Sequence, residues 1–466
     1  MRQKLTEGKI GPILVKLTVP TVLGLFTMLG FIIIDTYFVA QLGTKELAAM
    51  SFAFPAIILL DSVSTGLAIG TGCCISKAIG KSDKTTSSHR DRDKVKRLAT
   101  DSLILSLLIG VILVIIGLTT IDPLFTALGA KAEILPLIRQ YMEISYFGVI
   151  FVVVPIVGNN IIRATGNTLM PSVVLAVAGI INLVLDPIFI FGYGPIPAMG
   201  LQGAALATVI SRATILAVSL VFLHYYEQMI CLKLPSFKLL LRNWQNVLSI
   251  AIPNIGQNII RPISISFITS LIASYGTAAV AGFGIASKVE ILSVMVFLAL
   301  STSFIPFVGQ NWGAEQYNRV YLAWCLGFQF CLFWGALMAI ALGLGGSWVV
   351  SLFDKDPEVI KVAAEYLLIV PISYGAFGII LISSAIFNAL GKPLPSLLMS
   401  LTKMLFLYAP LAYLGSWLFG MDGIFAAACF ANVAVGIGAY IWSQKNLSFN
   451  NLNCLLYTSP SPRDSR

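Results

Sequence analysis

The sequence predicts an all-α polytopic membrane protein, with about twelve transmembrane helices in two parallel-repeat six-helix bundles around a central cavity. Three observations lead to this fold class. First, 57% of the 466 residues are hydrophobic and only 11% are charged, so a soluble chain of this length could not bury its apolar surface. Second, apolar runs long enough to cross a bilayer recur from one end to the other. Third, an internal repeat divides the chain into two halves of about six runs each.

Twelve segments have the length and composition of membrane spans, and short stretches that carry most of the charges separate them. In order, they cover residues 14–40, 47–76, 98–121, 135–162, 169–192, 201–224, 246–274, 279–311, 320–352, 360–388, 395–419 and 423–443. The second and eighth segments are long enough to tilt or to extend beyond the bilayer. The polar segment 451–466 resembles translated cloning sequence, and we expect it to be a non-native or disordered tail.

The distribution of lysine and arginine predicts the orientation. The loop 77–97 carries eight basic residues and is expected to be a solvated connector, whereas the loops that would lie on the other side carry few. By the positive-inside rule, both termini are cytoplasmic, which requires an even number of spans. We expect a monomeric multi-pass protein of the plasma (inner) membrane. The net charge of +9 lies in these short loops, so it does not indicate nucleic-acid binding.

The internal repeat supports the two-bundle arrangement. Pro20 matches Pro253, and the pair Gly43-Thr44 matches Gly276-Thr277, both at an offset of 233 positions. Each half has an even number of spans, so both halves enter the membrane the same way round. We therefore expect an N-lobe over residues 1–232 and a C-lobe over residues 233–450, as in alternating-access transporters.

Two acids interrupt the apolar spans of the first half. The run 173–192 carries Asp186, with Asn182 four positions earlier on the same helical face and Pro187 directly after it. Asp35 lies in the first span, and its repeat counterpart is Ile268, so the bundle architecture does not itself require an acid there. An aspartate at the centre of a span costs about 2.5–3.5 kcal/mol on insertion scales, so such acids usually serve a function.

These residues suggest a site for a proton or a small cation. If Asp35 and Asp186 share a water-poor pocket, the pocket can close when protonated but needs water or a cation when ionised. Carboxylate, amide and hydroxyl oxygens would also suit a hard monovalent cation such as Na⁺. Pro20 and Pro187 are natural hinges between two states. The alternative is a buried acid paired with a base for packing. Thr208, in the sixth span, could contribute its hydroxyl oxygen to this site, or it could donate a hydrogen bond to a carbonyl of its own helix.

The polar residues of the second half favour a structural interpretation. Arg261, Lys288, Glu290 and Lys403 could pair internally, for example Arg261 with Glu290. Asn160, Gln257 and Asn258 would line the cavity or form interhelical hydrogen bonds. The sequence contains no Walker-type glycine loop, nucleophile elbow or HExxH motif, so it supports neither ATP-driven transport nor an enzymatic function. We expect no cofactor.

Five motifs resemble the multidrug and toxic compound extrusion (MATE) family, of the bacterial or archaeal kind. They are DTYFVAQLGTKELAA (35–49), NNIIRATGN (159–167), NLVLDPIFIFG (182–192), MGLQGAALAT (199–208) and FVGQNWGAEQYNR (307–319). The resemblance implies an exporter that moves amphipathic, often cationic compounds outward in exchange for H⁺ or Na⁺. It also implies that Asp35, Asn182, Asp186 and Thr208 form the cation or proton site. One departure is Arg261, which stands where some sodium-coupled members carry an acid, so coupling should depend on the first half.

We therefore expect a secondary-active multidrug efflux antiporter, with amphipathic drugs or dyes as its small-molecule partners. The alternative is a flippase for lipid-linked oligosaccharides or lipids of the same superfamily, for which Arg212, Arg261 and Lys403 would provide a cationic cavity. An integral membrane enzyme would need a polar catalytic cluster at one interface, which the sequence lacks.

Overall fold

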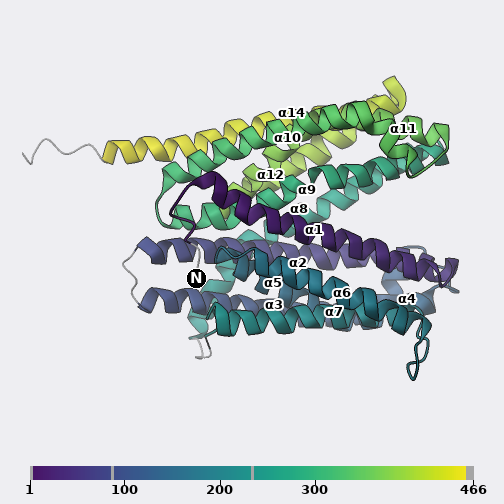
Figure 1. Ribbon diagram of the computed structural model, residues 1–466, viewed down its shortest axis with the longest axis horizontal. Helices are drawn as coiled ribbons and strands as arrows, with labels where there is room; N and C mark the ends of the chain where they lie inside the picture. Colours follow the sequence, from purple (N-terminus) through teal and green to yellow (C-terminus); the bar gives the residue numbers. More distant parts are fainter. Residues whose placement is uncertain (1–3, 85–88, 232–235, 458–466) are drawn as a thin grey trace, which may run out of the picture. The chain divides into compact units, whose positions relative to one another are not determined.

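The computed structural model describes residues 4–84, 89–231 and 236–457, and these residues are almost entirely helical (Figure 1). The helices are α1 (Ile10–Ala40), α2 (Thr44–Lys84), α3 (His89–Ala127), α4 (Leu135–Phe147), α5 (Ile150–Ala164), α6 (Leu169–Phe191), α7 (Leu201–Val221), α8 (Phe237–Ala273), α9 (Thr277–Gly313), α10 (Tyr317–Ser351), α11 (Pro357–Ile369), α12 (Tyr374–Ala389), α13 (Leu394–Leu401) and α14 (Ala409–Tyr457). Two π-helical segments, η1 (Phe222–Tyr226) and η3 (Thr402–Tyr408), and one 3₁₀ segment, η2 (Val370–Ser373), continue neighbouring helices.

The helices of the described residues account for the twelve predicted spans. Nine have the length and apolar composition to cross a membrane, and α4 with α5, bent by 41°, make a tenth. The stretch Leu394–Leu447 holds two spans, because its backbone leaves the helical conformation at Gly420. The remaining span is α8, which is less apolar than the others because of polar residues such as Asn254 and Arg261.

One detail of the sequence interpretation is wrong. The segment 77–97 is not a loop throughout, because α2 continues to Lys84 and α3 begins at His89, with only 85–88 outside the described residues. In the expected tail, α14 continues to Tyr457. Residues 458–466 lie outside the described part, and the origin of the tail stays a prediction.

The chain folds into two compact units that do not coincide with the predicted lobes. One unit includes Val19–Ile255, and the other combines Leu5–Thr18 with the residues from Gly256 onward. Thus α1 and α8 each contribute to both units. The division into lobes 1–232 and 233–450, with a cavity between them, stays a prediction.

The local structure follows the sequence repeat. Gly43 and Gly276 both have a positive φ, of 142° and 109°, and each is followed by the first residue of a long helix, α2 or α9. A positive φ is costly for a side chain and available to glycine, which explains why the same residue ends the connection in both halves. Later in each half, Gly166 and Gly391 take the same role in the turns that lead to α6 and α13, with φ of 94° and 77°.

A polar cluster fastens the start of α8 to α3 within the first unit. Asp101 is fully buried, and its carboxylate pairs with Arg97 at 2.7 Å. The side-chain amide of Asn243 donates to Asp101 Oδ2 at 2.8 Å. The indole of Trp244 donates to the backbone carbonyl of Asp101, also at 2.8 Å. Both carboxylate oxygens of this buried acid therefore have a charged or polar partner, as burial of a carboxylate requires.

Helix α14 reverses direction without a loop. Gly420 has φ 64° and ψ −142°, and the backbones of Gly415 and Gly423 come together around it. A Cβ atom on Gly423 would lie 2.1 Å from the carbonyl oxygen of Gly415, so only glycine allows this approach. The last two spans are thus joined by a turn of a few residues.

Candidate ion-coupling site

Helices α1 and α6 lie side by side in the first unit and run in the same direction. A Cβ atom on Gly24 would lie 3.1 Å from the hydroxyl of Ser172, and one on Gly179 would lie 3.5 Å from the Thr27 methyl group. Farther along, the rings of Phe38 and Phe191 meet edge to face, with centroids 6.3 Å apart. Asp35 on α1 and Asp186 on α6 both lie between the Thr27 contact and the Phe38 contact.

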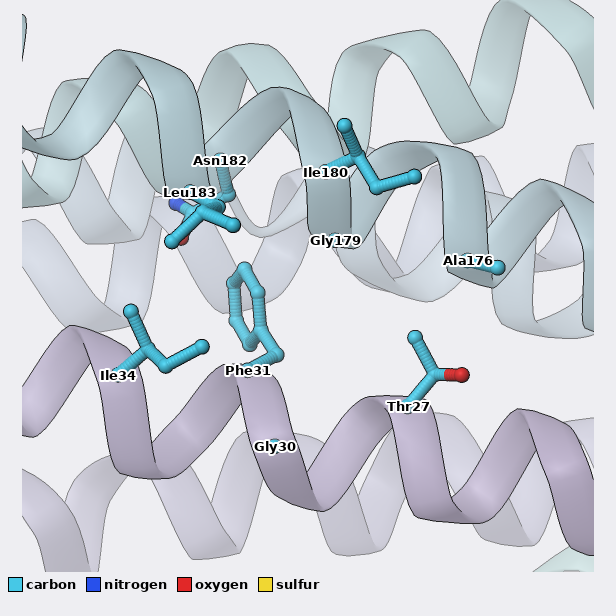
Figure 2. Close-up of a pocket in the computed structure, with 9 residues that line it drawn as sticks. All are labelled: Thr27, Gly30, Phe31, Ile34, Ala176, Gly179, Ile180, Asn182 and Leu183. Atoms are coloured by element: carbon cyan, nitrogen blue, oxygen red, sulfur yellow. The ribbon is translucent and has the colours of Figure 1, made fainter.

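A pocket of about 240 Å³ separates the two helices between these contacts. Figure 2 shows Phe31 reaching from α1 toward Leu183 and Asn182 of α6, with Thr27 at the other end of the pocket. Apart from Thr27 and Asn182, the lining is apolar. The pocket is therefore mainly apolar, and Asn182, one of the predicted site residues, forms part of its lining.

The structure brings the predicted site residues together around Asn182. Its amide nitrogen lies 3.5 Å from the hydroxyl of Thr208 on α7, at the long limit of a hydrogen bond. Asp186 lies one turn along α6, with its side chain fully buried. The Asp35 carboxyl is near enough to interact electrostatically with Asp186. Three helices thus contribute to one cluster, which we call the acid site: Asp35, Asn182, Asp186 and Thr208.

Several oxygens of the acid site have no hydrogen-bond partner among the described residues. They are both carboxyl oxygens of Asp186, one of Asp35 and the amide oxygen of Asn182. The Asn182 amide comes close to the Asp186 carboxyl without reaching hydrogen-bond geometry. Buried acceptors without donors are costly. A proton on a carboxyl, or a cation among these oxygens, would satisfy them.

The donor set suits a proton or a monovalent cation better than a transition metal. In residues 4–84, 89–231 and 236–457, no three His, Cys, Asp or Glu side chains converge as metal ligands. Carboxylate, amide and hydroxyl oxygens are hard ligands of the kind that alkali and alkaline-earth ions prefer. The roles of the four acid-site residues, with H⁺ or Na⁺ as the ion, stay predictions.

One charged residue beside the acid site, Arg212, enters the sequence analysis only in the flippase alternative and not as part of the ion site. Arg212 lies one turn after Thr208 on α7 and interacts electrostatically with Asp35. It also acts on Asp61 of α2 and on the buried Tyr141 of α4. The spacing of four between Thr208 and Arg212, which places both on one helical face, was the signal in the sequence.

The predicted cavity residues belong to both units, with Asn160 in the first and Gln257 and Asn258 in the second. The Asn160 amide donates to the Ile156 carbonyl of its own helix at 3.0 Å. Gln257 accepts a 2.8 Å hydrogen bond from Ser396 of α13, and the amide nitrogen of Asn258 has no partner in the described structure. A role in the cavity stays a prediction for all three.

The two proposed hinges lie within continuous helices. Pro20 is inside α1 and Pro187 is inside α6, and neither helix is interrupted at its proline. Bending at Pro20 and Pro187 during transport also stays a prediction.

The suggested ion pair of the second half is wrong. Glu290 accepts a hydrogen bond from the hydroxyl of Tyr366, and none of the ion pairs among the described residues joins it to Arg261. The ammonium group of Lys403 instead lies over the ring of Phe377, 4.1 Å from its centroid. Lys403 thus faces an aromatic ring rather than a carboxylate.

A helical membrane protein built from two repeated halves, with a buried acid site in one of them, has the architecture of a membrane transporter. The chain matches the family described as MatE over residues 20–188 and 251–414. The chain belongs to this family, the MATE transporters, whose members are transporters and not enzymes.

Two named relatives align with this chain over most of its length. An "FAD transporter" of Shewanella oneidensis is 36% identical over 444 residues, which are 95% of this chain and 96% of that protein. A "Probable multidrug resistance protein YoeA" of Bacillus subtilis is 25% identical over 87% of this chain and 88% of its own length.

The solved structures agree on the fold. A crystal structure of a mutant of the Vibrio cholerae MATE transporter VcmN matches with a TM-score of 0.88 and 28% identity, over 95% of this chain and 98% of that one. These comparisons confirm the twelve-helix, multi-pass membrane fold that the sequence predicts.

Proposed function

We propose that this MATE transporter is a secondary-active exporter that exchanges its substrate for H⁺ or Na⁺ by alternating access. The observation that carries the proposal is the acid site, where two intramembrane carboxyls lie close to an amide and a hydroxyl. Four of its oxygens have no donor within the described structure, so an incoming proton or cation has a place to bind. Inward movement of one charge across 100 mV supplies about 2.3 kcal/mol for export.

For the substrate, we propose a flavin dinucleotide or a similarly anionic aromatic compound. The support is the relative named as an FAD transporter, which is 36% identical to this chain along almost its full length. The second candidate class is amphipathic, often cationic drugs, and relatives named as multidrug proteins at 22–25% identity favour it. These named relatives favour a small-molecule cargo over the lipid-linked oligosaccharide.

The membrane placement that we propose follows the distribution of basic residues. With the eight lysines and arginines of 77–97 inside, both termini are cytoplasmic in the plasma (inner) membrane. We propose that the monomer is the transporting unit, because the acid site draws all four of its residues from one chain.

Transport by the purified protein in liposomes tests this function. With FAD or ethidium on the side from which export begins, an imposed pH gradient and then an imposed sodium gradient should separate the two coupling ions. We expect one gradient to drive FAD accumulation above the level without a gradient. Equal FAD flux with and without both gradients would contradict coupled export, and ethidium transport in place of FAD would select the second substrate class.

A further inference from the structure

Two basic side chains lie within the membrane spans of the second unit without an acidic partner. Arg261 of α8 is exposed and Lys403 of η3 is partly buried. Within the described residues, neither takes part in an ion pair or a hydrogen bond. An unpaired charge within a membrane span is costly, and it usually marks a functional site.

The two residues come from neighbouring helices, which a hydrogen bond joins nearby. Gln257 of α8 and Ser396 of α13 are joined by a 2.8 Å hydrogen bond. Arg261 lies one turn beyond Gln257, and Lys403 lies two turns beyond Ser396, on the face that each bonded residue occupies. The Arg261 charge acts electrostatically on Lys403, which places both in one cluster.

The sequence repeat gives this cluster an equivalent in the first unit. At the offset of 233 that relates α1 to α8, Arg261 takes the place of Met28, next to the pocket-lining Thr27. Aligning Ser172 with Ser396, Lys403 takes the place of Gly179, which lines the same pocket. Where the first unit has an apolar pocket between its paired helices, the second unit therefore carries two positive charges.

An aromatic surface completes the cluster. The Lys403 ammonium lies 4.1 Å from the centroid of the Phe377 ring. Glu290, the nearby acid that acts on Lys403, accepts a hydrogen bond from Tyr366 instead of pairing with the lysine. With one acid near two cations, the cluster keeps a net positive charge that an anion can neutralise.

We propose that Arg261 and Lys403, with Phe377 beside them, bind the anionic group of an aromatic substrate such as the pyrophosphate of a flavin dinucleotide. The guanidinium forms paired hydrogen bonds to phosphate oxygens, and the ammonium contributes a point charge. The proposal deepens the proposed function, and its substrate class rests on that function. In this proposal the acid site binds the coupling ion, and Arg261, Lys403 and Phe377 bind the exported compound.

Equilibrium binding to the purified full-length protein tests this site without any ion gradient. The probes are FAD, inorganic pyrophosphate and riboflavin, which carries the flavin ring without phosphate. The variants are Arg261→Gln and Lys403→Met, with Arg261→Lys as the conservative variant. The control is Lys361→Gln, since Lys361 is an exposed lysine of α11, with 75% of its side chain accessible.

We expect each neutral variant to weaken FAD binding about tenfold or more, the effect of losing one charged hydrogen bond. Riboflavin binding should change by less than about twofold, which also shows that the variants are folded. Arg261→Lys should recover part of the affinity, and the control should match the wild type.

Unchanged FAD affinity in both neutral variants would overturn the site, as would an equal loss of riboflavin binding. A wild-type protein that binds FAD no better than riboflavin would overturn it as well. Since coupled export is measured separately in liposomes, gradient-driven ethidium transport by a protein that does not bind FAD would reject the anion site and leave the coupling mechanism standing.

Discussion

Replacement of Asp186 by asparagine should uncouple export from the ion gradient while leaving the fold intact. The side chain is fully buried, and neither carboxyl oxygen has a hydrogen-bond partner among the described residues. An unpaired charge within a span costs up to about 2.5–3.5 kcal/mol, the value at the centre, and a bound proton or cation removes that cost. At about 1.4 kcal/mol for each factor of ten, Asp186→Asn should weaken ion binding on the order of 100-fold.

The assay is FAD or ethidium transport in liposomes under the gradient that drives the wild type. We expect Asp186→Asn to fall to the rate seen without a gradient, while equilibrium binding of the transported compound changes little. Asp122→Asn is the matched control, because Asp122 pairs with the half-exposed Arg139 and exposed ion pairs contribute little to stability. Wild-type transport by Asp186→Asn under both gradients would refute the assignment of this acid to the coupling ion.

Three further predictions concern stability and the acid site. Asp101→Ala should lower the free energy of unfolding by about 3–5 kcal/mol, because the buried Arg97 loses this carboxylate and the Asn243 amide loses its acceptor; a shift in thermal unfolding no larger than that of a surface pair would contradict this. Gly335→Ala should cost about 1–3 kcal/mol, since its Cβ would lie 2.3 Å from a backbone nitrogen of α12, whereas Gly345→Ala on the same helix has open space and should not destabilise in the same thermal assay. Thr208→Ala should weaken ion-coupled transport roughly two- to tenfold and Thr208→Ser should restore it, and equal rates for the two variants would remove the hydroxyl from the site.

The sequence was sufficient for the twelve spans and for much of the acid site. Apolar runs of membrane length and the repeat at an offset of 233 depend on composition and order alone, so no tertiary information was needed. Asn182 and Asp186 could be placed on one face because their spacing is helical. That they lie near Asp35 depended on family resemblance, because helix spacing says nothing about contacts between distant segments.

Other features depend on packing that spacing does not reveal. The break between α4 and α5 comes at Gly148, where an added Cβ would lie 2.4 Å from a methyl group of Val209, a contact from another part of the chain. The π-helical turn around Lys403 also has no signal in hydropathy. Glu290 pairs with Tyr366 instead of Arg261 because side-chain direction, not charge alone, decides which partner is within reach.

The glycine turn at Gly420 has a practical consequence for work on this protein. Because the backbones of Gly415 and Gly423 are in contact, an epitope, fluorophore or cleavage sequence inserted between them would force this turn apart. Probes that must report on this end of the second unit are better attached at the Leu352–Asp356 connection, where Leu352 and Phe353 are exposed and α10 has already ended.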